Sequence, residues 1–270
     1  MVSVNSASGQ IYANTINRND QAAKKSLNQI GSGKAINKAS DNAAGLAIAT
    51  QLMTDVSSLR QSSTNLIQGT SILQTADGAL EQSSNILNRM KELATQSNSG
   101  SLDANARNAI NQEYQSLSQE LNDLSSSTTF NGQSLVNGTY NNSFQAGVNG
   151  TDTINADLTS VNISSAGLGL TSNLTTQAGA MAASGELDAA INAVSSARSR
   201  IGAELSTFST RGNVLETQTE NTIAAQSAIM DADIGASMTE FIKSKNLSEV
   251  SIAAAAQGNQ MKSSMLKLVR

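Results

Sequence analysis

Side chains that could carry out catalysis are scarce in this chain of 270 residues, which contains no histidine and no cysteine. Without them the chain cannot build a Ser-His-Asp or Cys-His arrangement, a disulfide, or a zinc site with nitrogen and sulfur ligands. No glycine-rich phosphate-binding loop is present in the sequence. Asp231 and Asp233 stand close together, but two carboxylates without further ligands make a weak cation site, so a solvated turn or helix face is favoured. The sequence therefore predicts a protein that is not an enzyme, with no catalytic residue, no metal and no cofactor.

The composition favours long helices over a thick globular interior. Proline and tryptophan are absent, and aromatic residues make up 3% of the chain, so the core must consist mainly of aliphatic side chains that suit helix–helix contacts. The formal net charge is −4 and no dense basic tract occurs, which argues against nucleic-acid binding. No apolar run approaches the length of a membrane span, and residues 1–20 lack the pattern of a cleavable secretory signal.

Residues 41–98 carry the strongest secondary-structure signal. Leucine recurs at every seventh position there, in a register that comprises Leu52, Leu59, Leu66, Leu73, Leu80 and Leu87. This heptad spacing predicts one long helix with a narrow apolar seam, capped by Ser40 or Asp41. At 1.5 Å per residue the helix would be roughly 85 Å long. A helix of that length needs partners that cover its seam throughout.

Two weaker helical patterns flank this segment. Residues 1–35 carry sparse apolar positions among Asn, Ser and Gln, which predicts a marginal helix that becomes ordered against a partner. On the other side, Asn98-Ser99-Gly100 ends the long helix, and Ser101 or Asp103 caps the next one. Because this connection is short, the two helices are expected to pack antiparallel.

The second half of the chain repeats the pattern. A third helix is expected to begin at Ser184, and residues 234–270 are expected to continue as helix. The third helix carries a seven-residue register of Leu187, Val194, Ile201, Phe208 and Leu215. If the chain folds back on itself, these helices cover the seams of the first half. The pattern therefore predicts an elongated rod with both termini at one end.

Helical periodicity is lost in the middle of the chain, at residues 125–184. Alternating apolar residues lie on both sides of Asn149-Gly150, which predicts a β-hairpin within residues 143–158. This hairpin is the only sheet that the sequence predicts. The expected fold class is therefore mostly α: an elongated antiparallel helical hairpin or coiled-coil rod with a small β-hairpin region in the middle of the chain.

Several stretches of the chain resemble the signatures of bacterial flagellin. They occur in the same order along nearly the whole chain: GKAINKASDNAAGLAIA at 33–49, ADGAL at 76–80, LNRMKELATQSNSG at 87–100, FNGQSLVNG at 130–138, IMDADIGASMTEF at 229–241 and SMLKLVR at 264–270. The sequence departs from the family pattern at Ala35 and Ala228, where basic residues are usual, and at Ser237, where an acidic residue is expected. These departures bear on individual ion pairs between subunits. The short middle segment indicates that no large outer domain is present.

The resemblance implies a structural subunit that polymerises into the bacterial flagellar filament for motility. It implies that residues 1–40 and 236–270 form the inner filament layer, and that residues 41–180 and 186–235 form the surrounding rod. The inner-layer residues would then include Ile16, Leu27, Ile30, Phe241, Leu247, Val250, Leu266 and Leu268. The subunit would be exported unfolded, without a cleaved signal peptide, to the outside of the cell. The implied partners are further copies of the chain, the flagellar export apparatus, an export chaperone that binds the C-terminal region, and the filament cap and junction proteins.

One further surface follows from the resemblance. The segment around Arg89 and Leu93 resembles the patch of flagellin that the host Toll-like receptor for flagellin contacts, and Glu113 corresponds to a third contact. Residues four apart face one side of a helix. From the residues alone, Leu93 is part of the seam and Arg89 is a solvated charge. The resemblance instead favours a surface that binds the receptor in the free subunit and a neighbouring subunit in the filament.

Two alternatives remain open on the sequence. The chain could be a hook–filament junction protein or a surface flagellin homologue that binds a ligand, although a junction protein would be expected to diverge more in the terminal signatures. It could also be a coiled-coil translocator or secretion adaptor. That alternative predicts a soluble oligomer of defined size in place of a polymer.

Overall fold

The computed structural model describes residues 3–268. Within this range the elements are helices α1 (Ser3–Ser32), α2 (Ala43–Ser97), α3 (Ala104–Ser127), α4 (Gln177–Met230) and α5 (Ile234–Leu268), and strands β1 (Thr129–Phe130), β2 (Gln133–Ser134), β3 (Asn141–Gln145) and β4 (Thr153–Asp157). The predicted mostly helical fold with a β-hairpin in the middle of the chain is confirmed. No helix in the described range is both long enough and apolar enough to cross a membrane.

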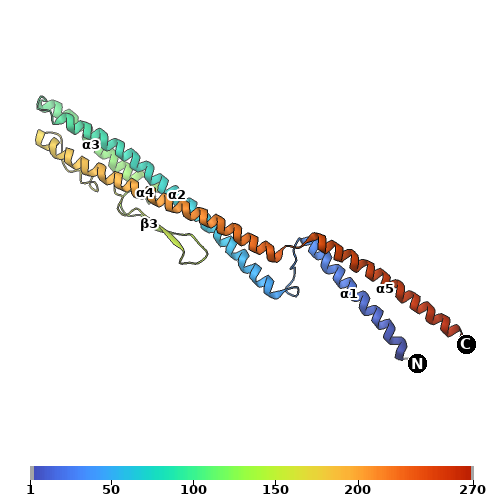
Figure 1. Ribbon diagram of the computed structural model, residues 1–270. Helices are drawn as coiled ribbons and strands as arrows, with labels where there is room; N and C mark the ends of the chain where they lie inside the picture. The colour runs from blue at the N-terminus through green and yellow to red at the C-terminus, as the bar shows by residue number, and fades with distance from the viewer. Residues whose placement is uncertain (1–2, 269–270) are drawn as a thin grey trace. The chain divides into compact units, whose positions relative to one another are not determined.

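The chain divides into two compact units. One unit comprises residues 1–55 together with 221–270, and the other comprises residues 56–220. We call them the terminal unit and the central unit. In the terminal unit, α1 (blue) and α5 (red) lie side by side (Figure 1). In the central unit, α2, α3 and α4 run alongside one another, with the β3–β4 hairpin against them (Figure 1).

The core of the central unit is built from the two predicted heptad registers. Its apolar cluster includes Leu59, Leu66, Leu73, Leu80 and Leu87 from α2 and Leu187, Val194, Ile201, Phe208 and Leu215 from α4, all buried. Tyr114 and Leu121 from α3 also belong to it, as do buried residues of the strand-containing region between α3 and α4, such as Leu135 and Leu158. A seven-residue repeat keeps one side of each helix facing its partner, which is why the two registers meet along the unit.

Leu52 is the exception among the predicted core leucines. It lies in the terminal unit and is only half-buried. The buried apolar positions at the beginning of α2 are Ala49 and Val56, on either side of Leu52. The buried stripe of α2 is therefore displaced there from the leucine register, so the assignment of Leu52 to the core is corrected to a partly covered position.

The cap of α2 differs from the prediction. The side chain of Asn42 accepts a hydrogen bond from the N–H of Gly45 at 2.9 Å, so Asn42 is the residue that caps the helix. Asp41 instead accepts hydrogen bonds from the N–H groups of Asn37 and Lys38. These bonds hold the pKa of the Asp41 carboxyl below its usual value. The acidic residue thus stabilises the turn before the helix, and the neutral amide caps the helix itself.

The start of α4 was also predicted wrongly. The helix begins at Gln177, seven residues before Ser184. The hydroxyl of Thr176 accepts a hydrogen bond from the N–H of Gly179 at 3.0 Å and caps the first turn. Ala180 is fully buried in this added turn. Alanine gives only a weak periodic signal, so the apolar pattern did not reveal that the helix extends this far.

Glu186 ties the loop before α4 to the helix. Its carboxylate accepts hydrogen bonds from the N–H and hydroxyl groups of Thr171 and Ser172, at 2.8 to 3.0 Å. Burial by itself raises the pKa of Glu186, but the hydrogen bonds from Ser172 and Thr171 outweigh it and lower the pKa. The loop therefore closes over the helix through four bonds to one charged group.

The predicted β-hairpin is present, and a second strand pair accompanies it. Strands β3 and β4 are antiparallel, with Phe144 opposite Ile154, and enclose the Asn149-Gly150 turn. The second pair, β1 and β2, was not predicted, so the expectation of a single sheet is wrong. Its turn residues Asn131 and Gly132 have φ angles of 50° and 77°. Two successive residues with positive φ angles form the tight turn of a two-residue hairpin, and an Asn-Gly pair favours this turn.

Candidate functional site

Among the described residues, the most deeply covered positions of α1 and α5 are occupied by small side chains. Ser26 on α1 and Ser244 and Ser248 on α5 are buried. The hydroxyl of Ser248 donates a hydrogen bond to the carboxylate of Asp20 at 3.1 Å. Small residues let two helices approach closely, but they bury little apolar area. The pairing of α1 with α5 therefore leaves most of the large apolar side chains that the structure describes on α5 exposed, together with Ile11 and Leu27 of α1.

The uncovered side chains extend around α5 beyond a single stripe. Large apolar residues of α5 with exposed side chains are Ile234, Met238, Ile242, Leu247, Val250, Ile252 and Met261, and α1 adds Ile11 and Leu27. Val250 is 64% exposed. These apolar residues are interspersed with exposed charged residues such as Glu240 and Lys243, and exposed apolar side chains on several sides of one helix indicate that other protein surfaces cover it. We call this set of exposed residues the terminal apolar surface; exposed apolar residues gathered in this way indicate an interaction site.

The predicted inner-layer residues divide between the α1–α5 contact and this surface. Ile16, Ile30 and Phe241 are half-buried, whereas Leu27, Leu247 and Val250 belong to the terminal apolar surface. The side chains of Leu266 and Leu268 lie outside the described residues. Met238 and Ile252 of the terminal apolar surface are not among the predicted inner-layer residues. The signal that identifies them is that apolar and polar residues of α5 are not separated onto opposite sides of the helix, which the heptad search did not test.

Backbone hydrogen bonds join the connector between α1 and α2 to the break between α4 and α5. The N–H of Ala35 donates to the carbonyl of Met230 at 2.6 Å, and the N–H of Ala232 donates to the carbonyl of Gly33 at 3.0 Å. Gly33 has a φ angle of 69°, which lies in the left-handed region of backbone conformation that favours glycine. Because Ala35 contributes its backbone here, its missing basic side chain does not affect this pairing.

The other two departures from the family pattern lie on the adjoining helices. Ala228 is exposed near the end of α4, and Ser237 is buried in the first turns of α5. The short serine occupies a covered position where the family pattern has an acidic side chain. An acidic group there would need a partner for its charge.

The two carboxylates considered for a cation serve as structural acceptors. Asp233 accepts a hydrogen bond from the N–H of Ala236 at 3.0 Å and caps α5. Asp231 accepts a hydrogen bond from the hydroxyl of Ser227. Across residues 3–268, no three acidic side chains come together in a way that could hold a metal ion.

Arg89 and Glu113 are brought together by the packing of α2 against α3. The guanidinium of Arg89 donates to the carboxylate of Glu113 at 2.7 Å and to that of Glu92 at 3.0 Å. The hydrogen bonds that Arg89 donates to Glu113 and Glu92 raise the pKa of Arg89. All three side chains are largely exposed, so these pairs add little stability. They form a charged patch on the surface of the central unit.

Leu93 does not belong to this patch. Its side chain is only 2% exposed and is part of the central core, next to Met90 and Ala94. The expectation that Leu93 shares the exposed side of α2 with Arg89 is therefore corrected. A third helix, α3, packs on α2 at this level and widens the buried side beyond the seam, so a spacing of four residues no longer implies equal exposure.

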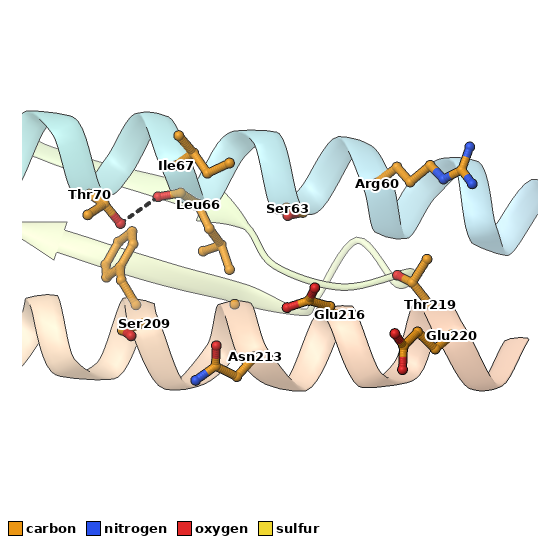
Figure 2. A pocket seen from close by; sticks show the side chains of 12 residues that line it. Arg60, Ser63, Leu66, Ile67, Thr70, Ser209, Asn213, Glu216, Thr219 and Glu220 are labelled. Atoms are coloured by element: carbon orange, nitrogen blue, oxygen red, sulfur yellow. Dashed lines mark hydrogen bonds between the residues drawn. The ribbon is translucent and has the colours of Figure 1, made fainter. Parts of the chain in front are cut away.

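A groove of about 540 Å³ lies between α2 and α4 in the central unit. Figure 2 shows Leu66 pointing from α2 toward α4 inside it, and Phe208 also lines it. Its rim carries Arg60, Glu216 and Glu220, all exposed to solvent.

Comparisons with known proteins agree with the resemblance seen in the sequence. Residues 2–141 match the family model of the bacterial flagellin N-terminal helical region, and residues 185–269 match that of the bacterial flagellin C-terminal helical region. The chain is 36% identical over 249 residues to a flagellin of Halalkalibacterium halodurans, covering 92% of each chain. It is 34% identical over 294 residues to a flagellin of Bacillus subtilis, covering 95% of this chain and 97% of that one.

Two solved structures of flagellar proteins are similar to this chain in fold. The crystal structure of Bacillus cereus flagellin is 30% identical to this chain, with a TM-score of 0.51 over 60% of this chain and 94% of that one. A putative flagellar hook-associated protein from Vibrio parahaemolyticus has a TM-score of 0.59 at 15% identity, over 71% of this chain and 100% of that one. At that identity the second likeness concerns the fold alone.

Proposed function

Because this chain belongs to the bacterial flagellin family and is a structural subunit of the flagellar filament, we propose that α1 and α5 form the inner layer of that filament. In this proposal residues 1–40 and 236–270 pack against the same segments of neighbouring subunits. Residues 41–180 and 186–235 form the surrounding layer. A flagellin is a structural protein, so no enzymatic role is assigned to the grooves or carboxylates of the chain.

The terminal apolar surface is the observation that carries this proposal. Most of its residues lie on α5, and in the single subunit α1 covers only one side of that helix. Burying an exposed Val, Leu or Ile side chain contributes about 1.5–3 kcal/mol, so covering this surface favours association strongly. A contact between two different faces of the subunit repeats from copy to copy, and it grows into an open helical polymer when it does not close into a ring.

We extend the proposal to the route by which the subunit reaches the filament. The subunit is exported unfolded to the outside of the cell without a cleaved signal peptide, and a chaperone covers its C-terminal region before export. The export apparatus, the filament cap and the junction proteins are its further partners. The exposed apolar residues of α5 support the chaperone, because a free subunit with such a surface is prone to aggregate unless another protein binds it.

Filament formation by the purified full-length chain tests the inner-layer proposal. Monomer seeded with short filament fragments, or salted out of solution, is expected to grow into long filaments visible by negative-stain electron microscopy. Growth should stop at a critical monomer concentration, which sedimentation measures. A sharp population of small oligomers under all these conditions would contradict the proposal and favour a secretion adaptor.

The charged patch of Arg89 and Glu113 is the part of the receptor hypothesis that remains after the correction of Leu93. We expect Arg89→Ala to weaken binding of the free subunit to the ectodomain of the host Toll-like receptor for flagellin. An arginine at the centre of an interface contributes about 2 kcal/mol, which is about a 30-fold change in Kd. Titration calorimetry of monomer with the ectodomain measures it.

Arg198→Ala is the matched control for this experiment. Arg198 is also a partly exposed arginine of the central unit, and it pairs with Asp77 and Glu81 at 3.0 and 3.3 Å. Its loss should leave the affinity unchanged. Equal affinities for wild type and the Arg89 variant would remove the patch from the receptor hypothesis. Leu93→Ala is unsuitable as a test because the cavity it leaves in the core destabilises the subunit whether or not a receptor binds.

A further inference from the structure

Two methionines stand among the aliphatic residues of the terminal apolar surface. Met238 and Met261 lie on α5 and are 45% and 60% exposed. Met90, by contrast, is fully buried in the core of the central unit. With about 3.6 residues per turn, positions 238 and 261 are about 140° apart around the helix axis. The two thioethers therefore face different neighbours when α5 is surrounded.

An exposed thioether is open to a specific chemical change. A hydroperoxide such as hydrogen peroxide transfers one oxygen atom to the sulfur of methionine. With hydrogen peroxide, the sulfur lone pair forms the new S–O bond, the O–O bond breaks, the proton of the transferred oxygen passes to the departing hydroxide, and water leaves. The sulfur is oxidised and the peroxide is reduced. The product, methionine sulfoxide, is polar and can be reduced back by methionine sulfoxide reductases.

We propose that Met238 and Met261 are oxidation sites through which a hydroperoxide converts the free subunit into a form that no longer assembles. This inference rests on the proposed inner-layer role of α5. In the free subunit both side chains are reachable, and in the filament neighbouring subunits cover them. The sulfoxide oxygen must then lose its water on assembly without a partner designed to receive it, which disfavours association.

Oxidation is expected to raise the critical concentration for filament growth at least about tenfold for each modified site that is buried. The oxidant acts on subunits before assembly and leaves finished filaments largely unaffected. Reduction of the sulfoxides restores assembly. The terminal apolar surface thus makes incorporation sensitive to the peroxide that a free subunit meets.

The test compares three full-length proteins with and without hydrogen peroxide. Met238→Leu combined with Met261→Leu keeps the apolar volume but removes both thioethers. Met181→Leu is the matched control, because Met181 is 63% exposed on α4 but belongs to the central unit. Peroxide should raise the critical concentration of wild type and of the Met181 variant, and it should leave the double variant unchanged. Equal sensitivity of the double variant and wild type would overturn the proposal.

A second measurement uses wild type alone and needs no variant to fold. Peptide mass spectrometry follows oxidation of Met238 and Met261 in monomer and in preformed filaments. We expect oxidation in filaments to be at least about tenfold slower, because burial removes access to the sulfur. Equal rates in both states would overturn the proposal. If untreated wild type forms no filaments at all, the inner-layer role fails first, so the two failures are distinguishable.

Discussion

Replacing Leu66 and Leu73 together by aspartate is expected to unfold the central unit. Both side chains are at most 2% exposed and lie in one apolar cluster with residues of α4. Each substitution would place a carboxylate among aliphatic groups with no cationic partner, at a cost of several kcal/mol. A domain of this size is stable by about 5–15 kcal/mol in total, so two such charges remove most or all of its stability.

Far-UV circular dichroism and urea unfolding measure this effect. Ile67→Asp is the matched control, because Ile67 is adjacent to Leu66 on α2 and is 65% exposed. It should change the free energy of unfolding by no more than about 0.5 kcal/mol. A double variant with the helical signal and urea midpoint of wild type would show that the leucine seam is not the core.

Removing residues 236–270 is expected to abolish filament growth while leaving a soluble subunit. The truncation deletes most of the terminal apolar surface and deprives α1 of the helix that it packs against. None of the described side chains of α5 belongs to the core of the central unit, so the thermal unfolding of that unit should persist. Electron microscopy and sedimentation after seeding measure the loss of assembly, and circular dichroism measures what remains folded.

A full-length variant separates the role of the helix from the role of its exposed side chains. Ile242→Asp combined with Val250→Asp keeps α5 in place but adds two charges to residues that are 52% and 64% exposed. These changes should be nearly neutral for the free subunit and should prevent assembly, because each charge would be buried between subunits. Continued filament growth by the truncated chain or by this variant would exclude α5 from the inner layer.

The local sequence pattern was sufficient to predict an element wherever its residues follow one simple rule of spacing or turn type. Leu59 to Leu87 recur at seven-residue intervals with no proline to interrupt them, and one helix follows from that. Asn149-Gly150 between alternating residues was sufficient for the β3–β4 hairpin. The prediction of where α4 begins was wrong because the first turns of the helix are buried through Ala180. A small residue such as alanine can be buried in a core but gives only a weak signal in the apolar pattern.

Three conclusions followed from the sequence by itself. Without histidine and cysteine, several kinds of catalytic and metal site are excluded; the heptad spacing predicts the long helices; and the family signatures indicate the family. Each of these depends on residue identity or on spacing along one chain. Tertiary structure decided which side of each element is covered. Leu93 is buried because α3 packs on α2, and Arg89 meets Glu113 for the same reason. The apolar residues of α5 were visible from the start, but only the structure shows that α1 covers one side of the helix and leaves the rest exposed. Burial depends on contacts between segments distant in sequence, and no periodicity within one helix determines where its neighbours end.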